Sequence, residues 1–353
     1  MNNSILNKRQ DHILSALSAE RGVGMAMILA KLAKSYGSVT KITVVRDLDK
    51  LIGFGYVARG GKGRATVYRL SPRYELLRPI DIRKYFEKEA DERIGQKGFN
   101  FGIFPLLQNL FAENDTKELN NLNEAYRRHI AKLPKDIVKS EFERLTVEFS
   151  WKSSRIEGNT YSLLETETLL KEGKEAKGHK KDEAIMILNH KKTLDFIHEN
   201  PKEFKKLSLR GIEHVHGLLI KGLGVSAGLR KSPVGITGTA YRPLDNIHQI
   251  RENMEKACDA VNKVKDIFEK CLIASLMIAY IQPFADGNKR TSRMIGNAIL
   301  IAHGFCPLSY RSANETEYKK AVILFYERNN LHYFKTLFME QFRFAVENYF
   351  KGV

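Results

Sequence analysis

Two apolar stretches of the chain flank a short polar segment. Residues 272–281 form a continuous apolar run, and residues 294–302 are apolar at helical spacing. Pro283 and Gly287 interrupt the chain between them, so the pattern predicts a helix, a tight loop and a second helix that starts near Gly287 or Asn288. The N-terminus of a helix presents unpaired backbone N–H groups and a partial positive charge, and both favour a bound anion.

The polar segment places three charged residues around that helix start. Arg290 and Arg293 are three positions apart and share one face of the first turn. Asp286 comes just before the turn, and one carboxylate together with phosphate oxygens suits Mg²⁺. The segment therefore predicts a site for a polyphosphate and its metal ion.

Residues 282–293 also resemble the signature of the Fic family. The positions that match it are Pro283, Phe284, Asp286, Gly287, Asn288, Arg290 and Arg293. Two positions depart from its commonest form: Gln282 replaces the family's histidine, and Lys289 stands where a glycine is usual. Fic enzymes mostly transfer AMP from ATP to a protein hydroxyl, and that histidine takes the proton. A glutamine amide has no usable pKa, so Gln282 cannot act as a general base.

The resemblance implies ATP and Mg²⁺ as cofactors, with Asp286 holding the metal and Gln282 at the catalytic position. The nucleotide contacts that it implies are Gly287, Asn288, Lys289, Arg290, Arg293, Gly235, Ile236, Thr237, Gly238 and Tyr318. Tyr318 matches an aromatic residue that often lies near the adenine, and stacking and core packing would both explain it.

A second segment resembles a regulatory motif of the same family. Residues 136–172 have a helical pattern, in which Ser153 and Glu157 lie four apart on one face and Gly158 follows. In the Fic inhibitory motif this glutamate pairs with the last arginine of the signature, which here is Arg293. A bidentate Arg–carboxylate pair competes with an Arg–phosphate pair, so the pairing keeps the ATP γ-phosphate out of its productive place. The alternative is a surface helix that ends at Gly158.

Residues 224–247 lack a helical period. Glycines and prolines are scattered there among short apolar stretches, which predicts a short β-hairpin. The resemblance implies that this hairpin is a flap over the nucleotide, closest to it at residues 235–238, and that it pairs with an extended target segment. An ordinary connecting loop is the alternative.

The first 74 residues have a different pattern. The predicted helices are 6–19, 25–35 and 42–53, and the predicted strands are 56–59 and 65–70. Ser38 or Thr40 is the expected N-cap of the third helix, and a basic, glycine-rich tip joins the strands. Three helices followed by such a hairpin resemble a winged helix-turn-helix domain.

Positive charge is concentrated in this region. It holds 13 lysines and arginines against 4 acidic residues, more than half the excess behind the chain's net charge of +17. A basic block of this kind favours nucleic acid as a partner. The residues expected to meet DNA are Lys41, Thr43, Arg46, Lys50, Lys62 and Arg64. The alternatives are a basic surface that serves only solubility, or a winged helix used for protein contact or dimerisation.

These patterns predict a mainly α protein, with a helical Fic core and a β-hairpin flap preceded by a small winged helix (α+β) domain. The expected boundaries are 1–74 for the winged helix, 75–135 for a helical linker region and 136–345 for the Fic domain, with the inhibitory helix near 145–160. The longest apolar run is too short to span a bilayer, and the three cysteines lack metal-binding spacing. We therefore expect a cytoplasmic protein without membrane contact. The oligomeric state stays open, with a homodimer among the alternatives.

Two function classes follow from the sequence. The first is an enzyme that transfers AMP to a hydroxyl of a target protein, autoinhibited by Glu157 and impaired by Gln282. The second is a catalytically inactive regulator of transcription, which binds DNA through the first region and senses ATP through a degenerate Fic core.

Overall fold

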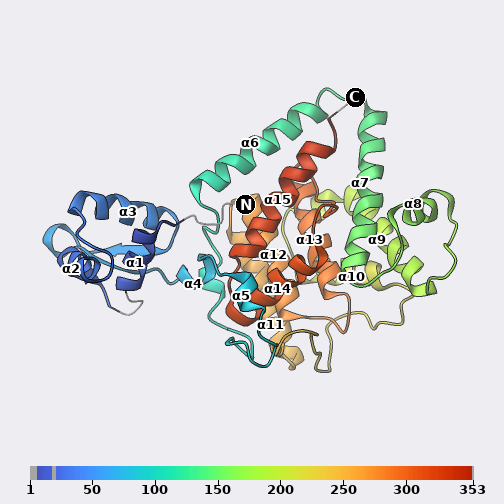
Figure 1. Ribbon diagram of the computed structural model, residues 1–353. Coiled ribbons are helices and arrows are strands. Elements are labelled where there is room, and N and C mark those ends of the chain that lie inside the picture. The colour runs from blue at the N-terminus through green and yellow to red at the C-terminus, as the bar shows by residue number, and fades with distance from the viewer. Residues whose placement is uncertain (1–5, 18–20, 352–353) are drawn as a thin grey trace. The chain divides into compact units, whose positions relative to one another are not determined.

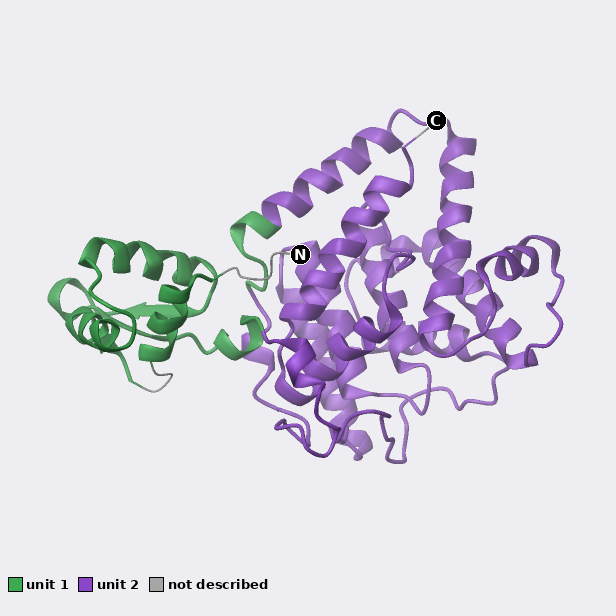
Figure 2. Ribbon diagram, viewed as in Figure 1, with its two compact units in different colours: residues 1–79, 109–115 green, residues 80–108, 116–353 purple. Residues whose placement is uncertain are grey.

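The computed structural model describes residues 6–17 and 21–351 and divides the chain into two compact units (Figure 2). The first unit comprises residues 1–79 and 109–115, and the second comprises residues 80–108 and 116–353. The described chain is mainly helical, as the sequence pattern predicts (Figure 1).

The first unit combines helices with a small sheet. Its elements are α1 (Lys8–Ala16), β1 (Val23–Gly24), α2 (Met25–Ser35), α3 (Lys41–Gly53), β2 (Val57–Gly60), the 3₁₀ turn η1 (Gly63–Ala65), β3 (Val67–Leu70) and α4 (Tyr74–Leu77). The sheet has the order β1-β3-β2 and is antiparallel throughout, with Val57 opposite Leu70. The helix predicted at 25–35 is confirmed. The two-residue strand β1 was not predicted, because it is too short for an alternating pattern.

The first helix is shorter than the predicted range 6–19. Asn7 caps α1 through a reciprocal pair of hydrogen bonds with Gln10, so the helix starts at Lys8. It ends at Ala16, and residues 18 and 19 of the predicted range lie outside the described residues.

Helix α3 buries a different face from the one that its apolar spacing predicts. Val44 and Leu48 are fully buried, whereas Ile42 is 67% exposed. Asp47 turns inward with the buried residues and accepts a hydrogen bond from Arg9 of α1. The polar contact between α1 and α3 therefore shifts the buried stripe and leaves Ile42 in solvent.

The second unit is built from helices. Its elements are α5 (Ile82–Tyr85), the 3₁₀ turn η2 (Phe104–Leu106), α6 (Glu113–Ile130, whose first three residues belong to the first unit), α7 (Lys135–Ile156), α8 (Leu163–Glu172), α9 (Lys181–Glu199), η3 (Pro201–Phe204), α10 (Leu209–Ile220), α11 (Ile247–Lys263), α12 (Ile267–Ile281), α13 (Asn288–Ala302), α14 (Glu315–Arg328) and α15 (His332–Asn348).

The centre of the second unit is the pair α12 and α13. Helix α12 is buried on every side from Phe268 to Ile281, and it packs against α13 and α11. The approach is close, because a Cβ at Gly296 would lie 2.8 Å from the hydroxyl oxygen of Ser275. That hydroxyl donates to the carbonyl oxygen of Ser292 over 3.2 Å. Because α9 and α10 also pack against α13, the polar loop between α12 and α13 has a fixed frame.

Two observations concern the predicted environment. Within residues 6–17 and 21–351, no helix combines the length and the apolar character that a bilayer crossing requires. Cys258, Cys271 and Cys306 are buried free thiols.

Candidate functional site

The loop between α12 and α13 leads into an uncapped helix start. Gln282 ends α12 in the left-handed conformation with φ 52°, and Gly287 precedes α13 with φ 79°. A Cβ at Gly287 would lie 3.3 Å from the side chain of Ile220, so both the conformation and the packing favour glycine. Among the described residues, no side chain caps α13, and its first-turn N–H groups are therefore left for an anion.

Asn288 and His216 hold this loop in shape. The Asn288 side chain accepts a hydrogen bond from the N–H of Phe284 and donates to the carbonyl oxygen of Phe284, both over 2.8 Å. The His216 ring stacks on Phe284 at 3.7 Å, and its Nε2 lies 3.0 Å from the carbonyl oxygen of Asp286. Burial lowers the pKa of His216 to about 4, so the neutral ring donates from Nε2. Nothing in the sequence pattern connects His216 with this loop.

Two arginines of α13 are buried beside the helix start. Arg290 is 2% exposed and pairs with Asp286 over 2.7 Å. Arg293 is fully buried and donates to the hydroxyl and carbonyl oxygens of Ser153 over 3.0 and 2.9 Å. In the described part of the chain, the Nη1 atom of each guanidinium has no hydrogen-bond partner. Buried donors are normally paired, so these two N–H groups suit a bound anion.

The carboxylate of Glu157, at the C-terminal end of α7, lies between two cations. Its Oε1 accepts a hydrogen bond from Arg293 over 2.9 Å, and its Oε2 lies 3.6 Å from the Nζ of Lys289. Burial alone would raise the pKa of Glu157, but Arg293 and Lys289 outweigh burial and hold that pKa below its usual value. Glu157 is therefore ionised. Gly158 follows it with φ 99°.

A cavity of about 380 Å³ opens over the start of α13. Of the residues predicted to form the site, it is lined by Glu157, Gly235, Ile236, Thr237, Gln282, Asp286, Gly287, Asn288, Lys289 and Arg290. The lining residues that the sequence did not single out are Ile156, Val234, Ala285, Lys319, Val322, Ile323 and Tyr326. The wall thus combines anion-binding groups with apolar side chains.

Gln282 brings no proton acceptor into this cavity. Its Nε2 donates to the carbonyl oxygen of Ala279 over 2.7 Å and lies 3.4 Å from the hydroxyl of Tyr326. The carboxylates among the lining residues are Asp286 and Glu157, and each is bonded to an arginine.

Tyr318 lies outside the cavity. It is 2% exposed, and the guanidinium carbon of Arg293 lies 5.3 Å from its ring centroid. Core packing is therefore the alternative that the structure supports. Val322 and Tyr326 follow Tyr318 at intervals of four on α14, and they line the cavity in its place. Helical spacing puts all three on one face, so it cannot tell which of them borders a cavity.

The segment 224–247 has turns and extended chain where the sequence predicts a β-hairpin, and the hairpin is not formed. Its polar groups bond to other segments. The N–H of Arg230 donates to the carbonyl oxygen of Pro283 over 2.9 Å, and its guanidinium donates to that of Gln282 over 2.7 Å. The N–H of Arg242 donates to the carbonyl oxygen of Lys97 over 2.9 Å. These contacts hold the segment beside the cavity without a strand ladder.

Asp286 is the predicted metal ligand. Its side chain is 66% exposed and lines the cavity beside the helix start, which fits Mg²⁺ held by one carboxylate and phosphate oxygens. Arg290 pairs with the same carboxylate and would compete with a metal ion for it. Within the described ranges, no three His, Cys, Asp or Glu side chains form a cluster that could hold a metal by themselves.

The residues predicted to meet DNA lie in the first unit. Those exposed to solvent are Lys41, Arg46, Lys50, Lys62 and Arg64. Thr43 is half-buried instead, and its N–H and hydroxyl both bond to the side chain of Thr40, the N-cap of α3. Thr43 therefore stabilises the helix start.

Residues 206–300 match the sequence model of the Fic/DOC family, a narrower range than the predicted 136–345. Protein adenylyltransferase fic-1 of Caenorhabditis elegans is 27% identical over 168 residues, which cover 46% of this chain and 33% of that protein. Protein adenylyltransferase Fic of Nematostella vectensis is 27% identical over 176 residues, which cover 47% and 40%. The chain thus spans about a third of the length of these curated relatives.

Solved structures share the fold of the second unit. Fic-1 from C. elegans superposes with a TM-score of 0.57 at 19% identity, covering 66% of this chain and 69% of that one. A Fic domain containing signalling protein from Bacteroides thetaiotaomicron superposes with a TM-score of 0.54 at 18% identity, covering 66% and 96%. The signature loop, its buried arginines and these similarities agree: the chain carries a Fic/DOC family domain at residues 206–300.

Proposed function

We propose that the second unit binds ATP with Mg²⁺ in the cavity over α13, and that it is a scaffold for adenylyl transfer to a protein hydroxyl under restraint by Glu157. The observation that carries the proposal is the Glu157–Arg293 pair at 2.9 Å, next to two unpaired guanidinium N–H groups. A carboxylate held there by the chain itself marks a place that suits a phosphate oxygen. The names of the curated relatives support ATP as the nucleotide.

Each group at the helix start then has a role. The backbone at Gly287 and Asn288 would hold the α- and β-phosphates, because the N–H groups of the first turn are uncapped. Arg290 would hold a distal phosphate, and Arg293 would join it once Glu157 moves away. Mg²⁺ on Asp286 would neutralise part of the phosphate charge.

The transfer itself requires a proton acceptor. The hydroxyl oxygen of the target bonds to the α-phosphorus, the bond from that phosphorus to pyrophosphate breaks, and the hydroxyl proton must leave. Gln282 cannot accept this proton, and positioned general bases contribute roughly 10²–10⁴-fold to such steps. Transfer by the unchanged chain is therefore slow.

Replacing Glu157 tests the restraint. Glu157→Gly is expected to bind ATP·Mg²⁺ about tenfold more tightly than the unchanged chain, because Arg293 and Lys289 become available to phosphate. Isothermal titration calorimetry measures both dissociation constants.

The matched control is Glu172→Gly. Glu172 ends α8 directly before the left-handed Gly173, as Glu157 ends α7 before Gly158, but its carboxylate faces solvent beside Lys174. This control should bind ATP like the unchanged chain. Equal affinities of all three chains, or no binding by any of them, would contradict the proposal.

A second function is proposed for the first unit, which we infer to be a winged helix that binds DNA. The observation that favours it is the gathering of exposed cations on α3 and on the β2–β3 connection. Lysine and arginine contacts with phosphate give affinity that falls steeply as salt rises. This activity can direct or regulate the second unit, so the two proposals are compatible.

DNA binding should weaken by orders of magnitude between about 50 and 200 mM salt if the first unit contacts several phosphates. Arg46→Ala with Lys50→Ala should lower the salt dependence by about two phosphate contacts. Fluorescence anisotropy of a labelled duplex measures both effects. A control that replaces Lys191 and Lys256, two exposed lysines of the second unit, should leave the slope unchanged. Salt-independent or undetectable binding would refute the assignment.

A further inference from the structure

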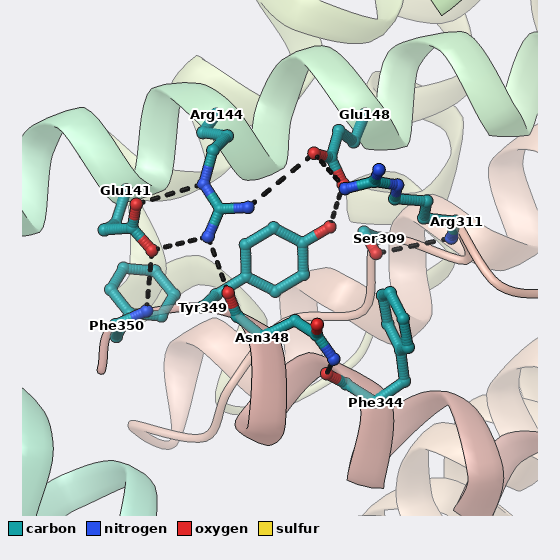
Figure 3. Close-up of polar contacts among 9 residues, drawn as sticks. All are labelled: Glu141, Arg144, Glu148, Ser309, Arg311, Phe344, Asn348, Tyr349 and Phe350. Carbon is teal, nitrogen blue, oxygen red and sulfur yellow. Dashed lines mark hydrogen bonds and ion pairs between the residues drawn. The ribbon is translucent and has the colours of Figure 1, made fainter. Parts of the chain in front are cut away.

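The helix that carries Glu157 is also held at its other half by polar contacts. Glu141, Arg144 and Glu148 project from one face of α7 toward the C-terminal end of α15 (Figure 3). They meet the last turn of α15 and the two residues after it, Tyr349 and Phe350. This end of α7 is therefore fixed by residues that come some 200 positions later in the chain.

Both backbone and side-chain groups of residues 348–350 take part. Arg144 donates to the carbonyl oxygen of Asn348 over 2.6 Å, and its guanidinium carbon lies 4.5 Å from the centroid of the Tyr349 ring. Glu141 accepts a hydrogen bond from the N–H of Phe350 over 2.9 Å. The resulting arrangement encloses the Tyr349 ring beneath α7 (Figure 3).

The central contact joins two buried polar groups. The hydroxyl of Tyr349 donates to Glu148, whose other oxygen accepts from Arg311 over 2.9 Å. Glu148 is 5% exposed and Tyr349 is 1% exposed. Separating them would leave a buried carboxylate and a buried hydroxyl without this bond, which is unfavourable. The contact therefore resists any shift of α7 relative to α15.

The same helix leads directly to the nucleotide site. Lys152, one turn after Glu148, pairs with Glu315 over 2.9 Å, and Ser153 and Glu157 then reach Arg293. The nine residues from Glu148 to Glu157 correspond to roughly 13 Å of helix. Because α7 is continuous from Lys135 to Ile156, a small displacement at Glu148 is transmitted to the carboxylate of Glu157.

We propose that residues 348–350 form a C-terminal strap on α7 that sets how firmly Glu157 holds Arg293. Loosening the strap lets α7 shift, weakens the Glu157–Arg293 pair and makes the arginine available to phosphate. The inference rests on the proposed function, because ATP is the ligand that Glu157 opposes there.

Tyr349→Phe tests the strap with the smallest change. It removes the hydroxyl that bonds to Glu148 and keeps the ring beneath Arg144. The variant is expected to bind ATP·Mg²⁺ about threefold more tightly than the unchanged chain. In a chain that already carries Glu157→Gly, the same substitution should leave the dissociation constant unchanged, because no restraint remains to be weakened.

Tyr333→Phe is the matched control. Tyr333 also belongs to α15 and its hydroxyl also donates to a glutamate, Glu317 of α14, so the control loses an equivalent bond without touching α7. Its affinity for ATP should equal that of the unchanged chain. Equal tightening by both tyrosine variants, no tightening by Tyr349→Phe, or equal tightening with and without Glu157 would each overturn the strap.

Amide hydrogen exchange separates this inference from the proposed function. Tyr349→Phe should speed exchange at residues 153–158, whereas Tyr333→Phe should not, and this readout needs no nucleotide. If ATP binds to none of the chains while exchange changes as expected, the strap stands and the ATP proposal fails. If exchange at residues 153–158 is unchanged, the strap is refuted whatever the nucleotide does.

Discussion

A chain with both Gln282→His and Glu157→Gly is expected to transfer AMP about 10²–10⁴-fold faster than a chain with Glu157→Gly alone. The imidazole would supply the proton acceptor that the amide lacks. The backbone tolerates the change, because residue 282 has φ 52°, a left-handed conformation in which histidine is enriched. The measurement is the appearance of AMP adducts by intact-mass spectrometry, on the chain itself and on proteins of an extract incubated with it and labelled ATP.

Gln282→Asn in the Glu157→Gly chain is the matched control. Asparagine also suits the left-handed conformation, but its amide accepts no proton, so transfer should stay at the level of Glu157→Gly alone. Failure of the histidine chain to form any adduct, although it binds ATP, would contradict the assignment of a transferase scaffold.

Arg293→Met is expected to destabilise the second unit by about 3 kcal/mol, because it leaves the carboxylate of Glu157 without its main partner in a largely buried position. The same variant should bind ATP at least tenfold more weakly, because a guanidinium bond to a phosphate is lost. Urea unfolding gives the first quantity and calorimetry gives the second.

A double variant, Arg293→Met with Glu157→Met, separates the two effects. Replacing both partners removes the unpaired charge, so much of the stability should return, while ATP binding should stay weak. Equal stability of the single and double variants would show that the pair is not what stabilises this region.

The sequence predicted those features that depend on neighbours along the chain. The apolar run at 272–281 lies within α12, and the loop signals placed the start of α13 at Gly287 or Asn288, where it is found. The helix at 25–35 has its predicted bounds for the same reason. The contact between Glu157 and Arg293 came from resemblance to a family motif, since 136 positions separate the two residues and no local pattern joins them.

The features that were missed depend on contacts between distant segments. The chain at 224–247 bonds to Pro283, Gln282 and Lys97, and local composition cannot show that these partners displace a strand ladder. Likewise, Glu141, Arg144 and Glu148 have the spacing of a solvated helix face, although they cover Tyr349.

The Glu157–Arg293 pair has a consequence for how the site responds to its surroundings. Because both residues belong to one chain, Glu157 acts as a tethered competitor, whose effective concentration does not depend on how much protein is present. Dilution leaves the occupancy of Arg293 by this carboxylate unchanged. Only the concentration and charge of the free anion, or a change in the chain itself, can alter it.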